Sequence, residues 1–502
     1  MIYADAPAHP TIRKRDLHML FNSYIFILAF LPLAVLGYYG FGRLGSKAAH
    51  GFLLAMSLLF CGYMNVYYAL ILVGGIVIDY AISRLLHGMK QSACAKAVLA
   101  GGVILNAGVL FYCKYLNFFL ENLNTLLGRD EVLTEVILPL GISFYTFRQI
   151  AYLVDSYRGE AGDDTFLEYA LFVSYFPTLT QGPITLRDEF MGQLRDPSRL
   201  RARGDNLATG LNRFAIGLSK KVLLADTLGK VVTVAFGGVE ILTSSDVLIT
   251  MICYSLQLYF DFSGYCDMAE GISLMLNLDL PANFRSPYKA ASILDFWDRW
   301  HLTLTRFLRK YLYFPLGGSR KGTLRTYVNI MIIFLISGLW HGANWTFIVW
   351  GALHGLFEVV TRLVKNGWEK MPKAIGWLIT FAFLNVSWLL FRADSIEQFY
   401  IMIRKVATAE SFAVSPLMLE GARLPEITHI EMLLGVNGFM NGIVWIYPAF
   451  LILLSMGIVL LGKNCREKTM RFTFWSAVGT VIMLIWPILS LSDITTFIYA
   501  QF

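Results

Sequence analysis

The chain has 502 residues, of which 56% are hydrophobic and only 15% are charged. Soluble proteins carry about 25% charged residues. The composition therefore excludes ordinary soluble domains, disordered chains and disulfide scaffolds, and it predicts apolar surface in contact with membrane lipid. The net charge of +7 would suit nucleic acid, but the basic residues lie between apolar runs, as in the loops of membrane proteins. We expect no nucleic-acid partner.

Uncharged runs of about 20 residues predict helices that cross the roughly 30 Å hydrocarbon layer. The first run, 19–42, follows three basic residues and has no small-residue cleavage site after it, which predicts a retained anchor. The runs 48–78 and 326–357 are long enough for two helices each or for one tilted helix. The other clear runs are 97–113, 169–186, 374–391, 432–462 and 472–492.

Three further apolar segments, 133–156, 206–237 and 244–277, contain charged residues. With them the chain has about 11 predicted crossings. Helices are required because open sheet edges cannot satisfy their backbone groups in lipid. We therefore predict an all-α polytopic membrane protein that forms a single membrane domain over residues 1–502.

The loops indicate how this domain is oriented. Two segments rich in Lys and Arg, 187–221 and 299–325, are predicted to face the cytoplasm. The more polar stretch 393–438 is predicted to form an excursion outside the membrane.

His341 lies near the middle of the longest uncharged run. An ionisable side chain there is costly and usually faces the protein interior or a water-filled cavity. A reactive imidazole and a neutral histidine that joins two helices both fit this position. We expect the flanking Gly338 and Gly342 to leave room for a substrate beside the ring. His354, in the same run, is predicted to be structural or interfacial.

His301 follows Asp298 by three residues. On one helix the Asp298 carboxylate would share a face with the imidazole and orient it. An amphipathic interfacial helix with aromatic anchors fits the same pattern. Farther upstream, Asp261 and Asp267 do not share a helical face, so they predict a cavity lining or buried basic partners rather than a paired acid site.

Motifs for metal binding, P-loop nucleotide binding and α/β-hydrolase chemistry are missing from the sequence. The six cysteines show no C-x-x-C spacing. We therefore expect no metal site.

Seven motifs are spread along the chain: Gly141 to Phe147, Tyr175 to Leu179, Gly182 to Ile184, Asp261 to Tyr265, Phe296 to His301, Tyr311 to Gly318 and Leu339 to Gly342. Together these motifs resemble those of the membrane-bound O-acyltransferase (MBOAT) family. They follow the family's order and cover about residues 110–360, the expected MBOAT core. The chain looks most like the bacterial branch of alginate O-acetylation, whose Phe-Arg-Ala (391–393) and carboxy-terminal Phe-Ile-Tyr-Ala-Gln-Phe it shares.

This resemblance implies short re-entrant or interfacial helices around a central funnel or tunnel. It implies that His341 is the family's essential histidine and that His301 matches its second, more variable position. Asp298 stands where the family's pattern has arginine. The resemblance also implies substrate contacts from Trp340, Asn344, Asp261, Ser263 and Tyr265, with Arg299 and Arg306 near the phosphates of the donor.

The activity implied is O-acetyl transfer. Acetyl-CoA would enter from the cytoplasm as a substrate, with no tightly bound cofactor, and His341 would be the general base. A separate extracytoplasmic transferase would finish the ester on a polysaccharide, and the chain would reside in the bacterial plasma (inner) membrane.

Two alternatives remain at this point. One is D-alanyl transfer from an acyl carrier protein, as in teichoic acid modification. The other is a proton-coupled transporter that uses Asp261, Asp267 and His341, although the chain has no repeated half of the kind many transporters show.

Overall fold

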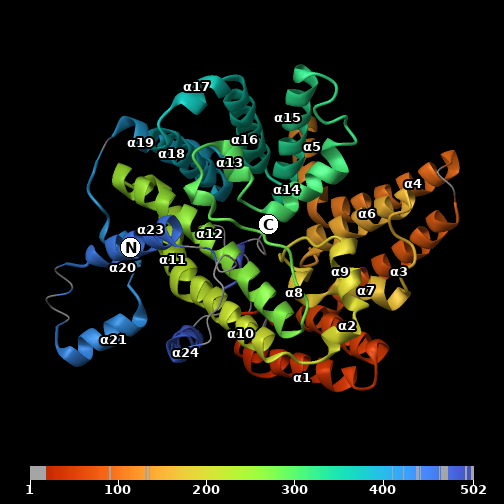
Figure 1. Cartoon of the computed structure of the whole chain (residues 1–502). Helices are drawn as coiled ribbons and strands as arrows, with labels where there is room; N and C mark the ends of the chain where they lie inside the picture. Colours follow the sequence, from red (N-terminus) through yellow and green to blue (C-terminus); the bar gives the residue numbers. More distant parts are fainter. Residues whose placement is uncertain are drawn as a thin grey trace.

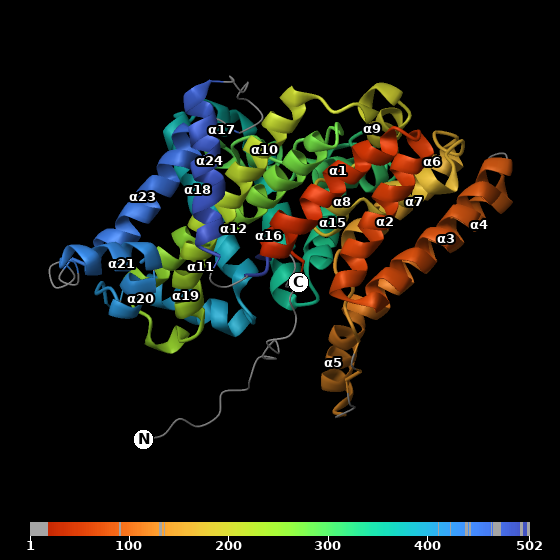
Figure 2. The same cartoon turned by 90° about the horizontal axis from the view of Figure 1, so that it is seen from below.

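The protein forms a bundle of helices, shown in two views in Figures 1 and 2. No strand occurs in the described part of the chain, which confirms the all-α prediction. The computed structural model describes residues 19–89, 92–129, 133–134, 136–409, 411–421, 423–436, 440, 443–462, 464, 473–491 and 495–498.

Seven of the described helical segments are long and apolar enough to cross a membrane. Three shorter apolar helical segments accompany them, Phe26–Gly42 (with α1, Leu31–Gly42), α23 (Ile446–Leu461) and α24 (Phe474–Leu489). These findings establish a multi-pass membrane protein. The seven long segments are α2 (Ser46–Met64), α3 (Val66–Gly88), α4 continuing into α5 (Ala93–Leu127), α12 (Ser244–Met275), α15 (Thr323–His341), α16 (Trp345–Leu363) and α18 (Lys373–Arg392).

The uncharged runs 48–78 and 326–357 are each divided between two helices. Asn65 separates α2 from α3, and its Oδ1 accepts a hydrogen bond from the Tyr67 backbone N–H at 2.9 Å. Asn344 separates α15 from α16 in the same way, with its Oδ1 3.0 Å from the Thr346 backbone nitrogen. In each case an asparagine caps the second helix and satisfies one of its free N–H groups.

The predicted crossing at 169–186 is wrong. This run forms α7 (Phe166–Ser174) and the four-residue α8 (Phe176–Leu179), followed by non-helical chain as far as 186. Neither helix is long enough to span the hydrocarbon layer, because each residue adds only about 1.5 Å. Pro177, Gly182 and Pro183 lie in this stretch and limit helix extension.

Of the weaker predicted segments, only 244–277 corresponds to a long membrane helix, α12. It lies in the centre of the bundle, against α10 (Gly204–Ser219) and α11 (Asp226–Phe236). Of the two alternatives predicted for Asp261 and Asp267, buried basic partners are confirmed: Asp261 pairs with Lys221 and Asp267 with Lys220. Glu270 of the same helix pairs with Arg213.

The bundle has two distinct ends. Figure 2 shows α9 (Arg187–Leu194) and α17 (Lys365–Lys370) at one end and α5 (Leu116–Leu127), α19 (Ile396–Thr408), α20 (Pro416–Gly421) and α21 (Pro425–Leu434) at the other. The predicted excursion 393–438 thus contributes helices at the end opposite α9.

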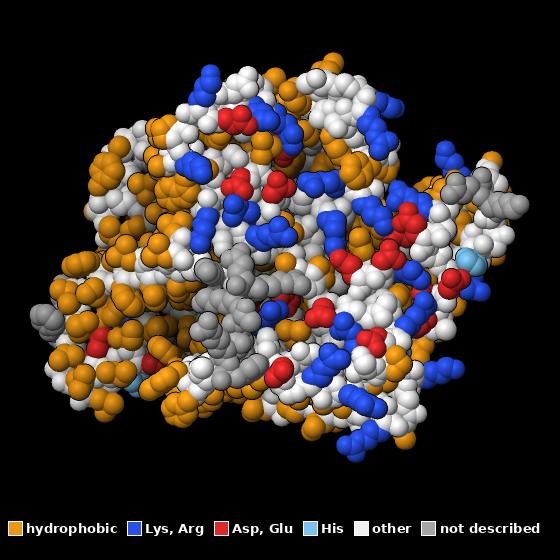
Figure 3. Space-filling model, viewed as in Figure 1, with side chains coloured by type: hydrophobic (Ala, Val, Ile, Leu, Met, Phe, Trp, Pro, Cys, Tyr) orange, Lys and Arg blue, Asp and Glu red, His pale blue; other side chains and the backbone are white. Residues whose placement is uncertain are grey.

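The two basic segments share one end. The Arg306 guanidinium pairs with Glu189 of α9, and Lys310 pairs with Asp155 at 3.1 Å. Figure 3 shows many Lys and Arg side chains on the side viewed in Figure 1. We call this surface, made by α9, α13 (Ile293–Trp297), α14 (Leu302–Leu308) and the turn Arg309–Tyr313, the basic face.

Candidate functional site

His341 is the last residue of α15 and is only 5% exposed. Three aromatic rings surround its imidazole. The ring centroids of Trp340, Trp350 and Phe391 lie 4.9, 5.2 and 5.2 Å from that of the histidine. The chain therefore places an imidazole in an aromatic, largely water-excluded setting at the end of a membrane helix.

Gly338 and Gly342 do not leave space for a substrate, contrary to the prediction. A Cβ at Gly338 would lie 2.3 Å from the Phe347 carbonyl oxygen, and one at Gly342 would lie 2.1 Å from the Phe347 ring. On the facing helix, a Cβ at Gly351 would lie 2.3 Å from the Phe334 carbonyl oxygen. These glycines let α15 and α16 approach closely, which is a common role of small residues four positions apart in membrane helices.

Lys114 holds the end of α15 from a neighbouring membrane segment. It lies in a short π-helical turn, Phe111–Tyr115, between α4 (Ala93–Leu110) and α5. Its Nζ donates to the carbonyl oxygens of Trp340 at 2.7 Å and His341 at 3.0 Å. Lys114 was not among the predicted site residues, although a lysine inside an apolar segment is itself a signal of function.

His301 precedes α14 and has a left-handed backbone with φ 46°. Its Nδ1 lies 3.1 Å from Asn283 Oδ1, which also accepts from the backbone N–H of Thr303 at 3.2 Å. A backbone N–H can only donate, so the Asn283 atom is an acceptor and Nδ1 of His301 carries the proton. The lone pair of the imidazole is therefore on Nε2, for which the described residues provide no hydrogen-bond partner.

Asp298 does not orient His301, contrary to the prediction. Helix α13 ends at Trp297, and α14 begins only at Leu302. The left-handed backbone of His301 interrupts the chain between these two helices. The two residues consequently do not share a helical face, and Asp298 pairs instead with Arg309 at 3.6 Å. Burial lowers the pKa of His301 to about 3, so this imidazole is neutral near pH 7.

Trp340 connects the two histidines. Its ring centroid lies 6.1 Å from that of His301 and 4.9 Å from that of His341. Trp340 and His341 also line a small cavity of about 50 Å³, together with Lys114, Ser143, Thr180 and Gln181. We call this the inner cavity. It is large enough for about one or two water molecules.

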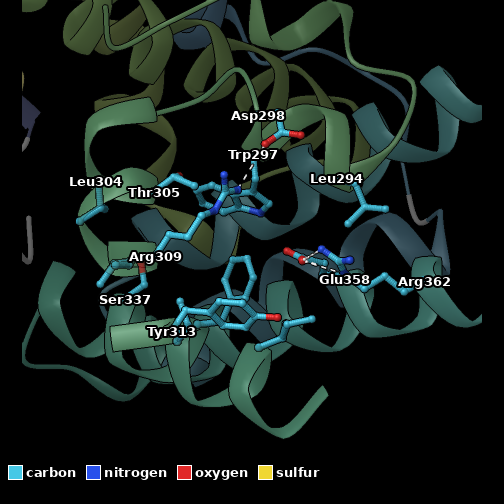
Figure 4. A pocket seen from close by; sticks show the side chains of 14 residues that line it. Leu294, Trp297, Asp298, Leu304, Thr305, Arg309, Tyr313, Ser337, Glu358 and Arg362 are labelled. Atoms are coloured by element: carbon cyan, nitrogen blue, oxygen red, sulfur yellow. Dashed lines mark hydrogen bonds and ion pairs between the residues drawn. The ribbon is translucent and has the colours of Figure 1, made fainter. Parts of the chain in front are cut away.

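A larger pocket, of about 370 Å³, runs along α15 from Ile330 to Ser337, one helical turn before His341. Figure 4 shows Arg309 reaching toward Asp298 on one side of this pocket, and the Glu358–Arg362 pair on another. We call it the arginine pocket. Arg309 and Arg362 are about half exposed, so its charged part lies toward the basic face.

The indole of Trp297 also lines the arginine pocket and is 8% exposed. No acceptor for its Nε1–H occurs among the described residues. A buried N–H donor without an acceptor is costly, and a ligand carbonyl in the pocket would satisfy it.

Asp261, Ser263 and Tyr265 belong to α12, and their hydrogen bonds go to other parts of the chain rather than to either histidine. Asp261 accepts from Lys221 Nζ at 2.9 Å and from the Ile498 backbone N–H at 2.9 Å. Ser263 is 3.4 Å from Lys220 Nζ. Only Tyr265 reaches the inner cavity indirectly, through a 2.5 Å hydrogen bond between its hydroxyl and that of Thr180.

The remaining expected contact residues have partners within the protein. Arg299 pairs with Asp295 at 2.6 Å, and Arg306 pairs with Glu189. Both lie on the basic face. Asn344 caps α16 and donates to the Asp394 carbonyl oxygen at 2.8 Å.

His354 has the structural setting that its position predicts. It is fully buried, its Nε2 lies 3.1 Å from Ser387 Oγ, and its ring lies 4.6 Å from that of Trp350. Because Trp350 also contacts His341, His354 supports one wall of the aromatic enclosure.

The site combines two imidazoles with arginines. Among the described residues no cluster of His, Cys, Asp and Glu could hold a metal ion. A buried imidazole can move a proton, and the arginines of the basic face can bind phosphate.

Comparison with known proteins identifies the class of this site. The profile of the membrane-bound O-acyltransferase family matches residues 97–396, a segment that contains both histidines, Lys114 and Asn283. Over 472 residues the chain is 39% identical to the "Peptidoglycan O-acetyltransferase" of Helicobacter pylori, and the match covers 88% of each chain.

Two further relatives are similar over shorter stretches. The "Probable alginate O-acetylase AlgI" of Pseudomonas aeruginosa is 36% identical over 406 residues, which is 80% of this chain and 77% of the relative. The "Teichoic acid D-alanyltransferase" of Bacillus subtilis is 27% identical over 300 residues, or 58% of this chain and 73% of the relative.

Proposed function

The chain belongs to the MBOAT family and is an acyltransferase, and from this premise we propose that it transfers acetyl groups from a cytoplasmic thioester for the O-acetylation of an extracytoplasmic glycan. The observation that carries the proposal is the position of His341, which lines the inner cavity and follows the arginine pocket by one turn of α15. The family membership leaves no reason to retain the transporter alternative.

His341 acts as the general base in this proposal. It accepts the proton of an acceptor hydroxyl, whose oxygen forms a bond to the acetyl carbonyl carbon. The carbon–sulfur bond of the donor breaks, and the proton passes to the departing thiolate. Base catalysis of this kind contributes about 10² to 10⁴ in rate, and the surrounding rings of Trp340, Trp350 and Phe391 limit competing hydrolysis by excluding water.

His301 binds a group that can donate a hydrogen bond. Its Nε2 carries a lone pair, because Nδ1–H is directed to Asn283, so the neutral ring can accept from a hydroxyl or an amide N–H but cannot donate to the donor carbonyl. This geometry favours a role for His301 in holding the acceptor hydroxyl or an amide of the donor.

In the proposal the donor approaches from the basic face, and the excess of Lys and Arg there supports a cytoplasmic position for this face. In the proposal, the acyl-bearing arm of acetyl-CoA enters the arginine pocket, where Trp297 Nε1–H can donate to one of its amide carbonyls. Arg309 and Arg362, at the charged part of the pocket, and Arg299 and Arg306 beside it are suited to the phosphates.

The relatives support acetyl transfer over D-alanyl transfer. The two relatives named for O-acetylation match 88% and 80% of this chain at 39% and 36% identity, whereas the D-alanyltransferase matches 58% at 27% identity. We propose a glycan of the bacterial cell envelope as the final acceptor, with the protein in the plasma (inner) membrane. A separate extracytoplasmic transferase would complete the ester.

The proposal is tested in cells that lack the gene and express wild type, His341→Ala, His341→Gln or, as a matched control, the surface variant His87→Ala at equal membrane levels. Acids released by mild base from peptidoglycan and secreted polysaccharide are identified by mass spectrometry. We expect wild type and His87→Ala to restore acetate and the His341 variants to restore none.

Release of D-alanine instead of acetate would overturn the proposal of acetyl transfer and favour D-alanyl transfer from a carrier protein. Full restoration by folded His341→Ala would overturn the catalytic assignment.

A further inference from the structure

Lys114 is a charged residue inside a membrane-spanning segment of 35 residues, Ala93–Leu127. No carboxylate pairs with it among the described residues. A lysine ammonium in this position is costly unless other polar groups replace water. Within the described residues, the hydrogen bonds that replace water are made with the end of α15 and with Ser143, whose Oγ lies 3.5 Å from Nζ.

The last turn of α15 has backbone carbonyls that the helix itself cannot satisfy. After His341 the chain leaves in an extended conformation, with Gly342 at φ −166° and ψ 156°, so no glycine cap closes the helix. Two consecutive side chains of the π-helical turn supply the missing donors. Lys114 donates to the carbonyl oxygens of Trp340 and His341. The Tyr115 hydroxyl donates to the carbonyl oxygen of Leu339 at 2.9 Å.

This arrangement is a helix cap provided by a segment more than 220 residues distant in sequence. A cation is favoured at a helix carboxyl terminus, where the aligned peptide dipoles place partial negative charge. Three hydrogen bonds to consecutive carbonyls restrain both the rotation and the axial position of the last turn. Because His341 is the final residue of that turn, the same bonds restrain the position of its imidazole.

We propose that Lys114 is a positioning residue for His341: with Tyr115 it caps α15 and holds the imidazole at the wall of the inner cavity. The inference rests on the proposed role of His341 as the base. Displacement of a reacting group by about 1 Å can lower a rate about 100-fold, so loss of the cap lowers turnover. Donor binding is unaffected, since the arginine pocket is lined by other residues.

The test compares Lys114→Met, Lys114→Arg, Tyr115→Phe and His341→Ala, purified in detergent. Lys96→Met is the matched control, because Lys96 is an exposed lysine of α4. Each protein is combined with membranes from cells that lack the gene, which supply the partner transferase and the glycan, and is assayed for acetyl transfer from acetyl-CoA to the glycan, with kcat divided by the fraction of folded protein. We expect Lys114→Met to lose at least about tenfold in kcat, with the KM for acetyl-CoA changed less than twofold.

Tyr115→Phe removes one bond of the same cap and is expected to lose less, whereas Lys114→Arg regains part of the lost kcat because arginine can also donate to two carbonyls. Lys96→Met is expected to match wild type. A folded Lys114→Met protein with wild-type kcat overturns the inference, as does a loss that appears only in KM. If Lys114→Met does not fold, Tyr115→Phe and Lys114→Arg provide the test instead. A wild-type kcat in both of these variants would overturn the positioning role of Lys114.

The His341→Ala arm separates this inference from the proposed function. Activity retained in His341→Ala overturns the role of His341 and the inference with it. An inactive His341→Ala protein beside a normal Lys114→Met protein leaves the proposed function intact and overturns only the positioning role.

Discussion

Asn283 accepts the Nδ1–H of His301 at 3.1 Å and thereby leaves the lone pair on Nε2. The same Asn283 oxygen accepts from the backbone N–H and the hydroxyl of Thr303. The side chain of Asn283 thus joins the loop between α12 and α13 to the first turn of α14. It also sets the tautomer of His301. No sequence motif pointed to it, because Asn283 is 18 residues from His301.

Asn283→Asp is predicted to make activity sensitive to acid. A carboxylate beside Nδ1–H favours the protonated imidazole, so it raises the pKa of His301 from about 3 toward the ordinary value of about 6.5. Wild-type His301 stays neutral down to about pH 4, whereas in the variant the ring protonates and loses its lone pair as the pH falls through the raised pKa. The acid limb of kcat against pH is expected to move to higher pH.

Asn283→Ala is the control for this experiment, because it removes the acceptor without adding a charge. It is expected to lower activity at all pH values and to cost about 1–3 kcal/mol of stability, with the acid limb unmoved. Identical pH profiles for wild type and Asn283→Asp would contradict the assigned role of His301.

Filling the arginine pocket is predicted to block the donor. Ser337 lines this pocket and is buried, so Ser337→Trp places an indole in the space assigned to the acyl-bearing arm. The KM for acetyl-CoA is expected to rise at least about tenfold, equivalent to about 1.4 kcal/mol of binding. Leu335→Trp, at an exposed position of the same helix, is expected to leave KM unchanged. Equal KM values for the two variants would exclude the arginine pocket as the donor route.

A single methyl group is predicted to disturb the crossing of α15 and α16. Gly338→Ala places Cβ 2.3 Å from the backbone oxygen of Phe347, and backbone cannot move aside as a flexible side chain can. We expect a loss of about 1–3 kcal/mol of stability and of most activity, measured as the thermal midpoint in detergent and as acetyl transfer. Gly457→Ala, in α23 with no neighbouring atom within 4 Å of the new Cβ, is expected to be neutral or stabilising. A stable, active Gly338→Ala protein would contradict the close crossing.

The ion pair between Lys221 and Asp261 is predicted to hold the carboxy-terminal residues in the bundle. Both side chains are buried, and they also bind the Thr496 carbonyl oxygen and the Ile498 backbone N–H. Lys221→Met leaves a buried carboxylate without its partner, which costs about 3–5 kcal/mol.

We expect a lower thermal midpoint and faster cleavage by carboxypeptidase than in wild type. Lys230→Met, at an exposed position of α11, is the control and should leave both unchanged. Resistance to carboxypeptidase equal to that of wild type in Lys221→Met would show that other contacts retain these residues.

Local patterns in the sequence determined the fold class and most of the membrane helices, and they made His341 a candidate for the reactive residue. These features depend on composition over about 20 residues or on one ionisable residue in an apolar run, and both are visible without knowledge of the fold. For Asp261 and Asp267 the sequence predicted either a cavity lining or buried basic partners, because an unpaired charge in that position is costly, and the structure has the basic partners.

Tertiary structure decided which side chains meet. The partner of His301 is Asn283 rather than Asp298, because a left-handed residue interrupts the helix that the three-residue spacing assumed. The space beside Gly338 is filled by α16, and the run 169–186 turns back instead of crossing. Lys114 reaches the carbonyls of Trp340 and His341 across 226 and 227 residues. The sequence shows which segments are apolar enough to form membrane helices. Which partner a particular donor or acceptor finds depends on how helices distant in sequence pack together, and this packing exists only in the folded chain.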